Sequence, residues 1–192
     1  MRIAILADTH LPRGPRRLPE GCIEACREAD LLIHAGDFVS LAALEAIEAI
    51  GPPLRAVHGN VDAPAIVDRL PAELTFAVGG ATIGLIHDAG PRRGRLARMR
   101  RRFPDSDAVI FGHSHMPLAE SGQGLTIFNP GSPTERRRSP VHTMGIAQVE
   151  AGRLSFAHIE LVPTAPRPAP PPSGSRSGAA GTQGARRIRR RS

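Results

Sequence analysis

The sequence of 192 residues contains no lysine, so all 25 of its basic residues are arginine. Seven of these arginines, and no acidic residue, lie in residues 163–192, which leaves 18 basic and 18 acidic residues in residues 1–162. The formal net charge of +7 therefore belongs to the C-terminal segment alone. Because residues 1–162 carry no net charge, the high isoelectric point is not evidence for a basic nucleic-acid-binding domain.

Long hydrophobic runs and cysteines are also scarce. Hydrophobic residues make up 41% of the chain, which suits a globular protein, but no run approaches the roughly 18–20 residues of a membrane span. The first strand-like run is too short, and Asp8 comes too early, for a signal peptide. Cys22 and Cys26 lie four residues apart in a predicted helix, and we interpret them as small buried core residues. We therefore expect a cytoplasmic protein with no membrane partner.

The C-terminal residues 163–192 have almost no large apolar side chain and contain six prolines and four glycines. Such a segment cannot offset its ordering entropy by burial, so we predict a disordered basic tail after one folded domain at residues 1–162. The tail is either solvated without a specific partner or binds acidic surfaces such as nucleic acid. A homo-oligomer also remains open.

The first half of the predicted domain alternates buried strands with helices. The strands are expected at residues 2–7, 31–35 and 54–57, and the helices at residues 20–29 and 41–50. The second half is richer in strands: hairpins at 74–86 and 143–159, single strands at 108–111 and 125–128, and a helix at 92–102. This order predicts an α/β protein with two sheets packed together and helices outside.

Five of the expected strands are followed at once by side chains that bind metals. In chain order these are Asp8-x-His10, Gly36-Asp37, Gly59-Asn60, His87-Asp88 and Gly112-His113-x-His115. Ligands bind at the carboxyl ends of strands in open α/β sheets, and alternate residues of an extended chain point the same way. Seven groups are too many for one ion and suit two borderline divalent metals such as manganese, iron, zinc or nickel. We interpret His34 and His58, which lie within apolar strands, as structural.

In order and spacing, these motifs resemble those of the calcineurin-like metallophosphoesterases. The runs Gly59-Asn60-Val61-Asp62 and Asn129-Pro130-Gly131-Ser132 resemble more narrowly the small bacterial and archaeal phosphodiesterase branch. The resemblance extends from Met1 to about Val162. It implies a four-layer α/β/β/α sandwich of two mixed sheets and a phosphodiesterase with two divalent ions, manganese first, with nickel, iron, zinc or magnesium as alternatives.

The resemblance also implies the ligand sets. One ion is held by Asp8, His10, Asp37 and His115, and the other by Asp37, Asn60, His87 and His113, with Asp37 bridging. Two such ions activate a bridging hydroxide and stabilise the in-line transition state. The catalytic residues are then expected to be Asp37, Asn60, His113 and Asp62. Two divalent ions, two carboxylates and a hydroxide leave one positive charge, which matches a small phosphodiester better than a dianionic monoester.

Three departures from the family pattern remain open. Val61 stands where many relatives have a histidine that protonates the leaving group, so Asp62 or metal-bound water would have to supply that proton. Asp88, after His87, either orients a ligand histidine or is an ordinary loop acid. Seven arginines within residues 92–102 form either a solvated helix face or an anion-attracting rim over the site.

Two other functions are weighed against the phosphodiesterase. One is a non-catalytic metal-binding interaction scaffold of the same fold, as in the retromer subunit. The other is a nuclease that the arginine-rich tail recruits to nucleic acid. The presence of all seven expected ligands favours the enzyme.

Overall fold

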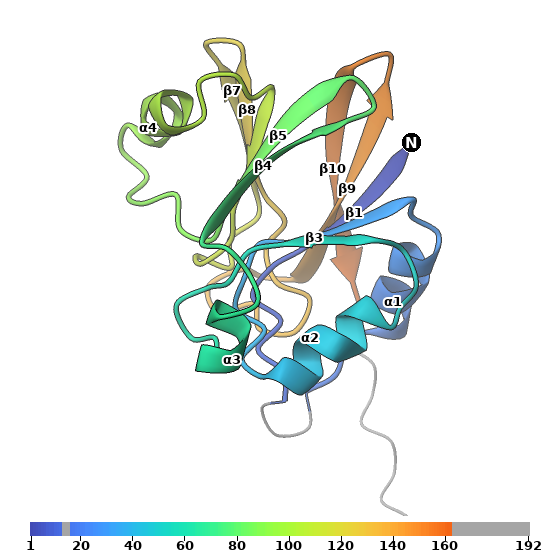
Figure 1. Ribbon diagram of the computed structural model, residues 1–192. Coiled ribbons are helices and arrows are strands. Elements are labelled where there is room, and N and C mark those ends of the chain that lie inside the picture. Colours follow the sequence, from blue (N-terminus) through green and yellow to red (C-terminus); the bar gives the residue numbers. More distant parts are fainter. Residues whose placement is uncertain (13–15, 163–192) are drawn as a thin grey trace, which may run out of the picture.

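The protein is described by a computed structural model that covers residues 1–12 and 16–162 (Figure 1). The predicted basic tail at residues 163–192 lies outside these described residues. Among the described residues, the helices are too short and too polar for any of them to cross a membrane.

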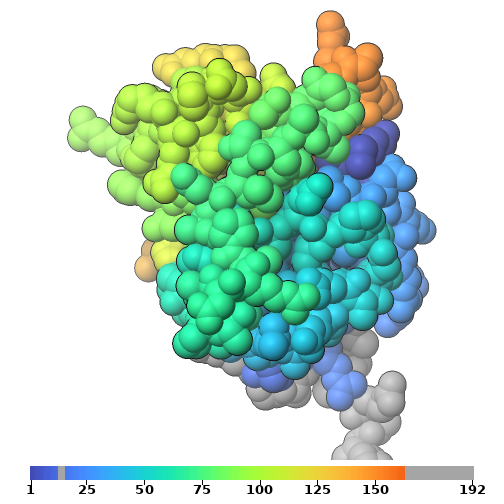
Figure 2. Space-filling view, in the orientation of Figure 1, coloured from blue at the N-terminus to red at the C-terminus, as the bar shows by residue number. Residues whose placement is uncertain are grey.

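The first sheet has five strands in the order β10-β9-β1-β2-β3. Three of them are parallel to one another: β1 (Arg2–Leu6), β2 (Leu31–His34) and β3 (Leu54–Ala56). The hairpin of β9 (His142–Glu150) and β10 (Arg153–Leu161) is antiparallel to β1 and completes the sheet. Figure 2 shows this orange hairpin beside the dark-blue N-terminal residues.

The second sheet also has five strands, in the order β4-β5-β6-β8-β7. Its three inner strands are parallel: β5 (Ala81–Ile86), β6 (Ala108–Ile110) and β8 (Leu125–Asn129). The edge strands β4 (Glu73–Val78) and β7 (Leu118–Gly122) are antiparallel to their neighbours. Both sheets are therefore mixed, as predicted.

Within residues 1–12 and 16–162, four helices connect or cover the strands. They are α1 (Glu20–Arg27), α2 (Leu41–Glu48), α3 (Pro64–Val67) and α4 (Arg95–Arg102). α2 begins where the Ser40 side chain accepts a hydrogen bond from the backbone N–H of Ala43, an ordinary N-cap. In Figure 1, α1 and α2 lie beside the first sheet and α4 lies beside β7 and β8.

Three separate apolar layers hold the molecule together. Along β1, Ala4 and Leu6 face the layer under α1 and α2, whereas Ile3 and Ile5 face the layer between the two sheets. A third layer, which includes Met99 of α4, lies on the outer face of the second sheet. Helices outside two packed sheets make the four-layer α/β/β/α sandwich that was predicted. Cys22 and Cys26 are fully buried in the first layer, which confirms their structural interpretation.

The structure adds to the sequence predictions and corrects one of them. The C-terminal hairpin, whose sheet the sequence left open, joins the first sheet, where β9 pairs with β1. α3 and β7 were not predicted: α3 has only four residues, and the Leu118–Gly122 strand is polar without apolar alternation. The helix predicted at residues 92–102 begins at Arg95, after Gly94 in left-handed backbone.

Candidate metal centre

The seven predicted metal ligands lie in loops that leave β1, β2, β3, β5 and β6, so both sheets contribute. Backbone hydrogen bonds join neighbouring loops: Asp8 N–H donates to the Gly36 carbonyl, and His10 N–H donates to the Asp37 carbonyl, each at 3.0 Å. A bond between the sheets runs from His113 N–H to Asp8 Oδ1 at 3.1 Å. These contacts place the loops of the first and second sheets against each other.

Five of the seven predicted ligands have left-handed backbone. Their φ angles are 55° at Asp8, 45° at His10, 64° at Asp37, 67° at His113 and 57° at His115. This region is uncommon for residues other than glycine, and strained backbone of this kind clusters at functional sites. Asp8 and His10, which were expected to pair, do converge, but their backbone is left-handed rather than extended. His113 and His115, the other expected pair, instead contact Asn60 and His10, respectively.

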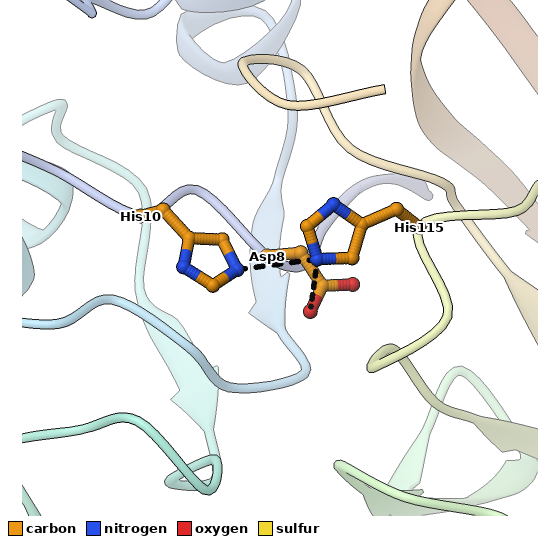
Figure 3. A group of neighbouring side chains, drawn as sticks. All are labelled: Asp8, His10 and His115. Atoms are coloured by element: carbon orange, nitrogen blue, oxygen red, sulfur yellow. Dashed lines mark hydrogen bonds and ion pairs between the residues drawn. The ribbon is translucent and has the colours of Figure 1, made fainter. Parts of the chain in front are cut away.

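The first group of converging side chains is Asp8, His10 and His115, all of them buried (Figure 3). Nε2 of His10 lies 3.2 Å from Nε2 of His115, which lies 3.5 Å from Asp8 Oδ1. Nδ1–H of His115 donates to the Glu135 carbonyl, so its Nε2 carries the lone pair that faces the group. Among the described residues, Asp8 Oδ2 is buried without a hydrogen-bond partner.

The second group is Asp8, Asp37 and His87. Asp37 Oδ2 lies between the two groups, 3.3 Å from Nε2 of His87 and 3.6 Å from Nε2 of His10. Nδ1–H of His87 donates to the Ala35 carbonyl at 2.7 Å, which again leaves the Nε2 lone pair facing inward. Asp8 belongs to both groups, whereas the family resemblance assigns it to one ion only.

Asn60 and His113 complete the constellation on its more open side. Asn60 Oδ1 lies 3.1 Å from Nε2 of His87 and 2.9 Å from Nδ1 of His113. Asn60 is exposed and His113 half-buried, whereas the other five ligands are buried. All seven predicted ligands therefore meet, and the centre opens toward Asn60 and His113.

This donor set fits divalent metal ions. Two imidazoles present lone pairs fixed by bonds to backbone carbonyls, which is the usual arrangement around a metal-binding histidine. The buried and unsatisfied Asp8 Oδ2 would be costly without a cation, because a lone carboxylate oxygen is poorly solvated there. Mixed imidazole and carboxylate donors suit borderline metals.

The pKa values show how the protein holds these groups without an ion. Burial raises the pKa of Asp8 to about 7. Burial also opposes ionisation of Asp37, but the hydrogen bond and charge of His87 outweigh it and hold the pKa of Asp37 at about 2. For His115, burial lowers the pKa to about 4, which favours the neutral imidazole that metals bind.

Three glycines allow the ligand loops to approach one another. A Cβ at Gly36, where φ is +91°, would lie 2.8 Å from Nδ1 of His87, and one at Gly59 would overlap Asp37 Oδ1. A Cβ at Gly112 would lie 3.1 Å from Asp8 Oδ2. Only glycine permits this close approach of the loops at the three positions.

Asp62, one of the two predicted sources of the leaving-group proton, connects two ligand loops through its carboxylate. Its Oδ1 accepts the N–H of Val39 at 2.6 Å, and its Oδ2 accepts those of Gly59 at 2.7 Å and Asp37 at 3.1 Å. Both carboxylate oxygens are thus acceptors that join the loops after β2 and β3. Three backbone N–H donors from two loops thus meet on one side chain. We therefore assign Asp62 as a positioning residue.

Contacts in the structure show the roles of His34 and Asp88. His34 is buried, stacks on Phe38, accepts the Gly36 N–H and lies 3.1 Å from Thr9 Oγ1, so it is structural as predicted. Asp88 is exposed and accepts the Gly90 N–H at 2.7 Å, which makes it a loop acid rather than a partner of a ligand histidine.

The arginines of α4 and its preceding loop are largely committed to structure. Arg95 donates to the Gly90 carbonyl, and Arg98 donates to the carbonyls of Ala89 and Pro91. Nε and Nη2 of both side chains are used on these carbonyls at 2.6–3.1 Å, so the loop holds both guanidinium groups. The anion-attracting rim predicted for residues 92–102 is therefore not supported at these two positions.

Sequence reasoning missed how the segment after β8 supports the centre. The Ser132 hydroxyl donates to the Asp8 carbonyl at 2.8 Å, and the Asn129 side chain donates to the Gly112 carbonyl at 2.7 Å. Both residues belong to the Asn-Pro-Gly-Ser run, whose position at the end of a strand was a usable signal. The run holds two ligand loops at once.

The four-layer fold and its centre of carboxylates and imidazoles define a metal-binding α/β protein. The model of the calcineurin-like phosphoesterase superfamily domain matches residues 1–152. A probable metallophosphoesterase of Methanothermobacter thermautotrophicus is 32% identical over 156 residues, which cover 80% of this chain and 89% of the relative. The chain therefore belongs to the calcineurin-like phosphoesterase superfamily, a family of metal-dependent hydrolases.

Solved structures share the fold. Vps29 from Entamoeba histolytica, solved with zinc, superposes with a TM-score of 0.67 at 19% identity and covers 83% of this chain and 99% of its own. A structure described as a novel archaeal phosphodiesterase gives a TM-score of 0.65 at 22% identity, covering 83% and 100%. At these identities the likeness establishes the fold alone.

Proposed function

We propose that the chain is a phosphodiesterase that works with two divalent metal ions. The observation that carries the proposal is the convergence of all seven metal-competent side chains, with Asp37 Oδ2 between two groups of donors. When bound, two neighbouring ions would supply an activated water and polarise the phosphoryl oxygens.

The chain's own residues hold and orient this centre. His87 and His115 are fixed by their Nδ1–H bonds to backbone carbonyls, and Asp37 is fixed by the Val61 N–H at 3.1 Å. Asn60 and His113 border the more open side, where a substrate would enter. Preorganised ligands of this kind require little rearrangement during the reaction.

A diester is the proposed substrate class because of charge. Two divalent ions, the carboxylates of Asp8 and Asp37, and one hydroxide ion would leave one positive charge for the substrate to balance. A phosphodiester carries one negative charge, whereas a monoester carries nearly two at neutral pH. The structure described as an archaeal phosphodiesterase has the same fold, which is compatible with this choice.

A non-catalytic scaffold of the same fold is the competing hypothesis. Such a protein has no need of a complete ligand set, or of strained backbone at five of the ligands. Both features therefore favour the enzyme. The third hypothesis is a nuclease that the basic tail recruits to nucleic acid. It predicts that the full chain binds polyanions in a salt-sensitive way and that residues 1–162 alone do not.

The test begins with metal analysis of the purified chain loaded with manganese. We expect two ions per chain and hydrolysis of bis(p-nitrophenyl) phosphate, with cyclic nucleotides and monoesters assayed beside it. Asp37→Asn should weaken the binding of both ions. The loss of affinity should exceed the roughly 10–100-fold that follows removal of a residue that only orients a ligand. The exposed Asp68→Asn is the matched control. Full activity and two tightly bound ions in Asp37→Asn would show the assignment to be wrong.

A further inference from the structure

Arg137 brings a guanidinium group to the edge of the metal centre. Its Nη1 donates to the carbonyl oxygen of His113 at 3.4 Å, and the residue is exposed. His113 contacts Asn60 on the more open side of the candidate centre, so the guanidinium lies at the rim of that side.

The segment that carries Arg137 is anchored to both ligand loops. The Thr134 hydroxyl donates to the Thr9 carbonyl at 2.6 Å, between two ligands of the first loop. The Glu135 carbonyl accepts the Nδ1–H of His115 in the second loop. These bonds fix the backbone beside Arg137 relative to the centre, although its side chain is exposed.

The guanidinium of Arg137 keeps donors for an anion. It forms no ion pair with any residue that the structure describes, and its bond to His113 is a long one. The neighbouring Glu135 carboxylate is paired with Arg16 at 3.0 Å and so is engaged elsewhere. Arg95 and Arg98, in contrast, use their donors on backbone carbonyls.

We propose that Arg137 binds the non-bridging oxygens of the phosphoryl group on which the metal centre acts. The inference rests on the proposed function and names a substrate-binding residue for it. A planar guanidinium matches two phosphate oxygens and stays charged at any working pH. The non-bridging oxygens of a diester and the oxygens of inorganic phosphate offer the guanidinium the same acceptors, so inorganic phosphate serves as the probe of this contact.

The test compares two adjacent arginines. Arg137 has left-handed backbone with φ of 45°, which asparagine adopts more readily than most residues, so Arg137→Asn removes the charge with little backbone strain. Arg138→Asn is the matched control, because Arg138 is exposed and makes no side-chain hydrogen bond or ion pair with the described residues. Arg137→Lys retains the charge without the two-pronged geometry.

Each variant is loaded with manganese as the full chain. Calorimetry measures the dissociation constant of inorganic phosphate, and kinetics give KM and kcat for bis(p-nitrophenyl) phosphate. Loss of a charged hydrogen bond should raise the phosphate dissociation constant and KM by about 10–100-fold in Arg137→Asn. Arg137→Lys should recover part of the loss, and Arg138→Asn should change either constant by less than about threefold.

Equal effects in Arg137→Asn and Arg138→Asn, or no effect in either, would overturn the proposal. Loss of bound manganese in Arg137→Asn would also overturn it, because Arg137 would then support His113 rather than substrate. The failure of the proposed function gives a different result: a wild-type chain that binds metal and phosphate but hydrolyses no diester. The phosphate measurement still tests Arg137 in that case.

Discussion

Asp8 is a carboxylate that the metal-free fold stabilises poorly in its ionised form. It is fully buried, Oδ1 accepts one backbone N–H, and Oδ2 has no partner among the described residues. Burial therefore raises its pKa from 3.8 to about 7. A cation between Asp8 and the two histidines would supply the missing partner, so this residue links stability to metal binding.

Metal-free protein should lose stability as pH rises because of Asp8. Between about pH 4 and pH 7 the folded state holds a proton that the unfolded state has released, so the free energy of unfolding falls with rising pH. The loss should be on the order of 1–4 kcal/mol and should be absent in Asp8→Asn, which cannot ionise. Thermal melts of both metal-free proteins from pH 4 to pH 8 measure it. Parallel pH profiles would contradict the assignment, and added metal should restore the wild type at pH 8.

Val61 bears on how the leaving group departs. General acid help is worth about 10²–10⁴-fold, and valine cannot provide it. Reaction rates should therefore fall steeply as the pKa of the leaving alcohol rises, and less steeply in Val61→His. A series of aryl and alkyl phosphodiesters, assayed at one pH with saturating metal, measures both slopes. The backbone N–H that holds Asp37 is retained in this variant.

Val67→His serves as the control for that series, because Val67 is an exposed valine on α3. Its slope should equal that of the wild type. A flat dependence in the unmodified chain would mean that another residue already donates the proton. His34 is engaged with Thr9 and Gly36, so His58 would then be the first candidate to examine.

At the scale of elements, the loops after β2 and β3 form one unit because Asp62 joins them. Its two oxygens accept N–H groups from Asp37 and Val39 on one side and Gly59 on the other. The ligands Asp37 and Asn60 lie on these loops. The relative position of these two predicted ligands therefore depends on Asp62, which is not itself a predicted ligand.

Asp62→Asn should loosen this unit, because an amide nitrogen cannot accept a backbone N–H. We expect the free energy of unfolding to fall by about 1–3 kcal/mol and metal affinity to weaken by roughly 10–100-fold. The dependence on leaving-group pKa should not change. Denaturant unfolding, metal titration and the diester series measure the three effects, with Asp68→Asn as control. Unchanged stability with a steeper dependence would reinstate Asp62 as the proton donor.

For the whole molecule, the centre exists because two sheets bring their strand ends together. The His113 N–H bond to Asp8 joins the sheets directly, and Ser132 adds a second bond to the Asp8 carbonyl. β9 and β10 complete the first sheet, although they follow every strand of the second sheet in the sequence. The domain is thus closed by its last described strands.

Deletion of residues 163–192 should leave the domain and its chemistry intact, because these residues offer almost no large apolar side chain for burial. We expect the melting temperature to shift by less than about 2 °C, since surface changes usually alter stability by under 0.5 kcal/mol. KM and kcat for a small diester should be unchanged. A larger shift, or lost activity, would show that the segment packs on the domain.

The sequence by itself determined which metal-competent side chains follow the strands, and in which order they do so. These are local properties: Asp37 follows a buried apolar strand, and that placement survives whatever the sheet order is. The spacing of apolar residues likewise predicted twelve of the fourteen described elements in part, among them β1 and α1. Short or polar elements such as α3 and β7 carry too weak a pattern to be predicted.

Tertiary structure alone decided which distant residues meet. Nothing in the sequence near Asp62 shows that its carboxylate faces the N–H groups of residues 37 and 39, because that contact spans more than twenty positions. The same holds for Ser132 and Asp8, which are 124 positions apart. Side-chain chemistry is local, whereas hydrogen-bond partners depend on how the two sheets pack, and only the folded chain specifies that.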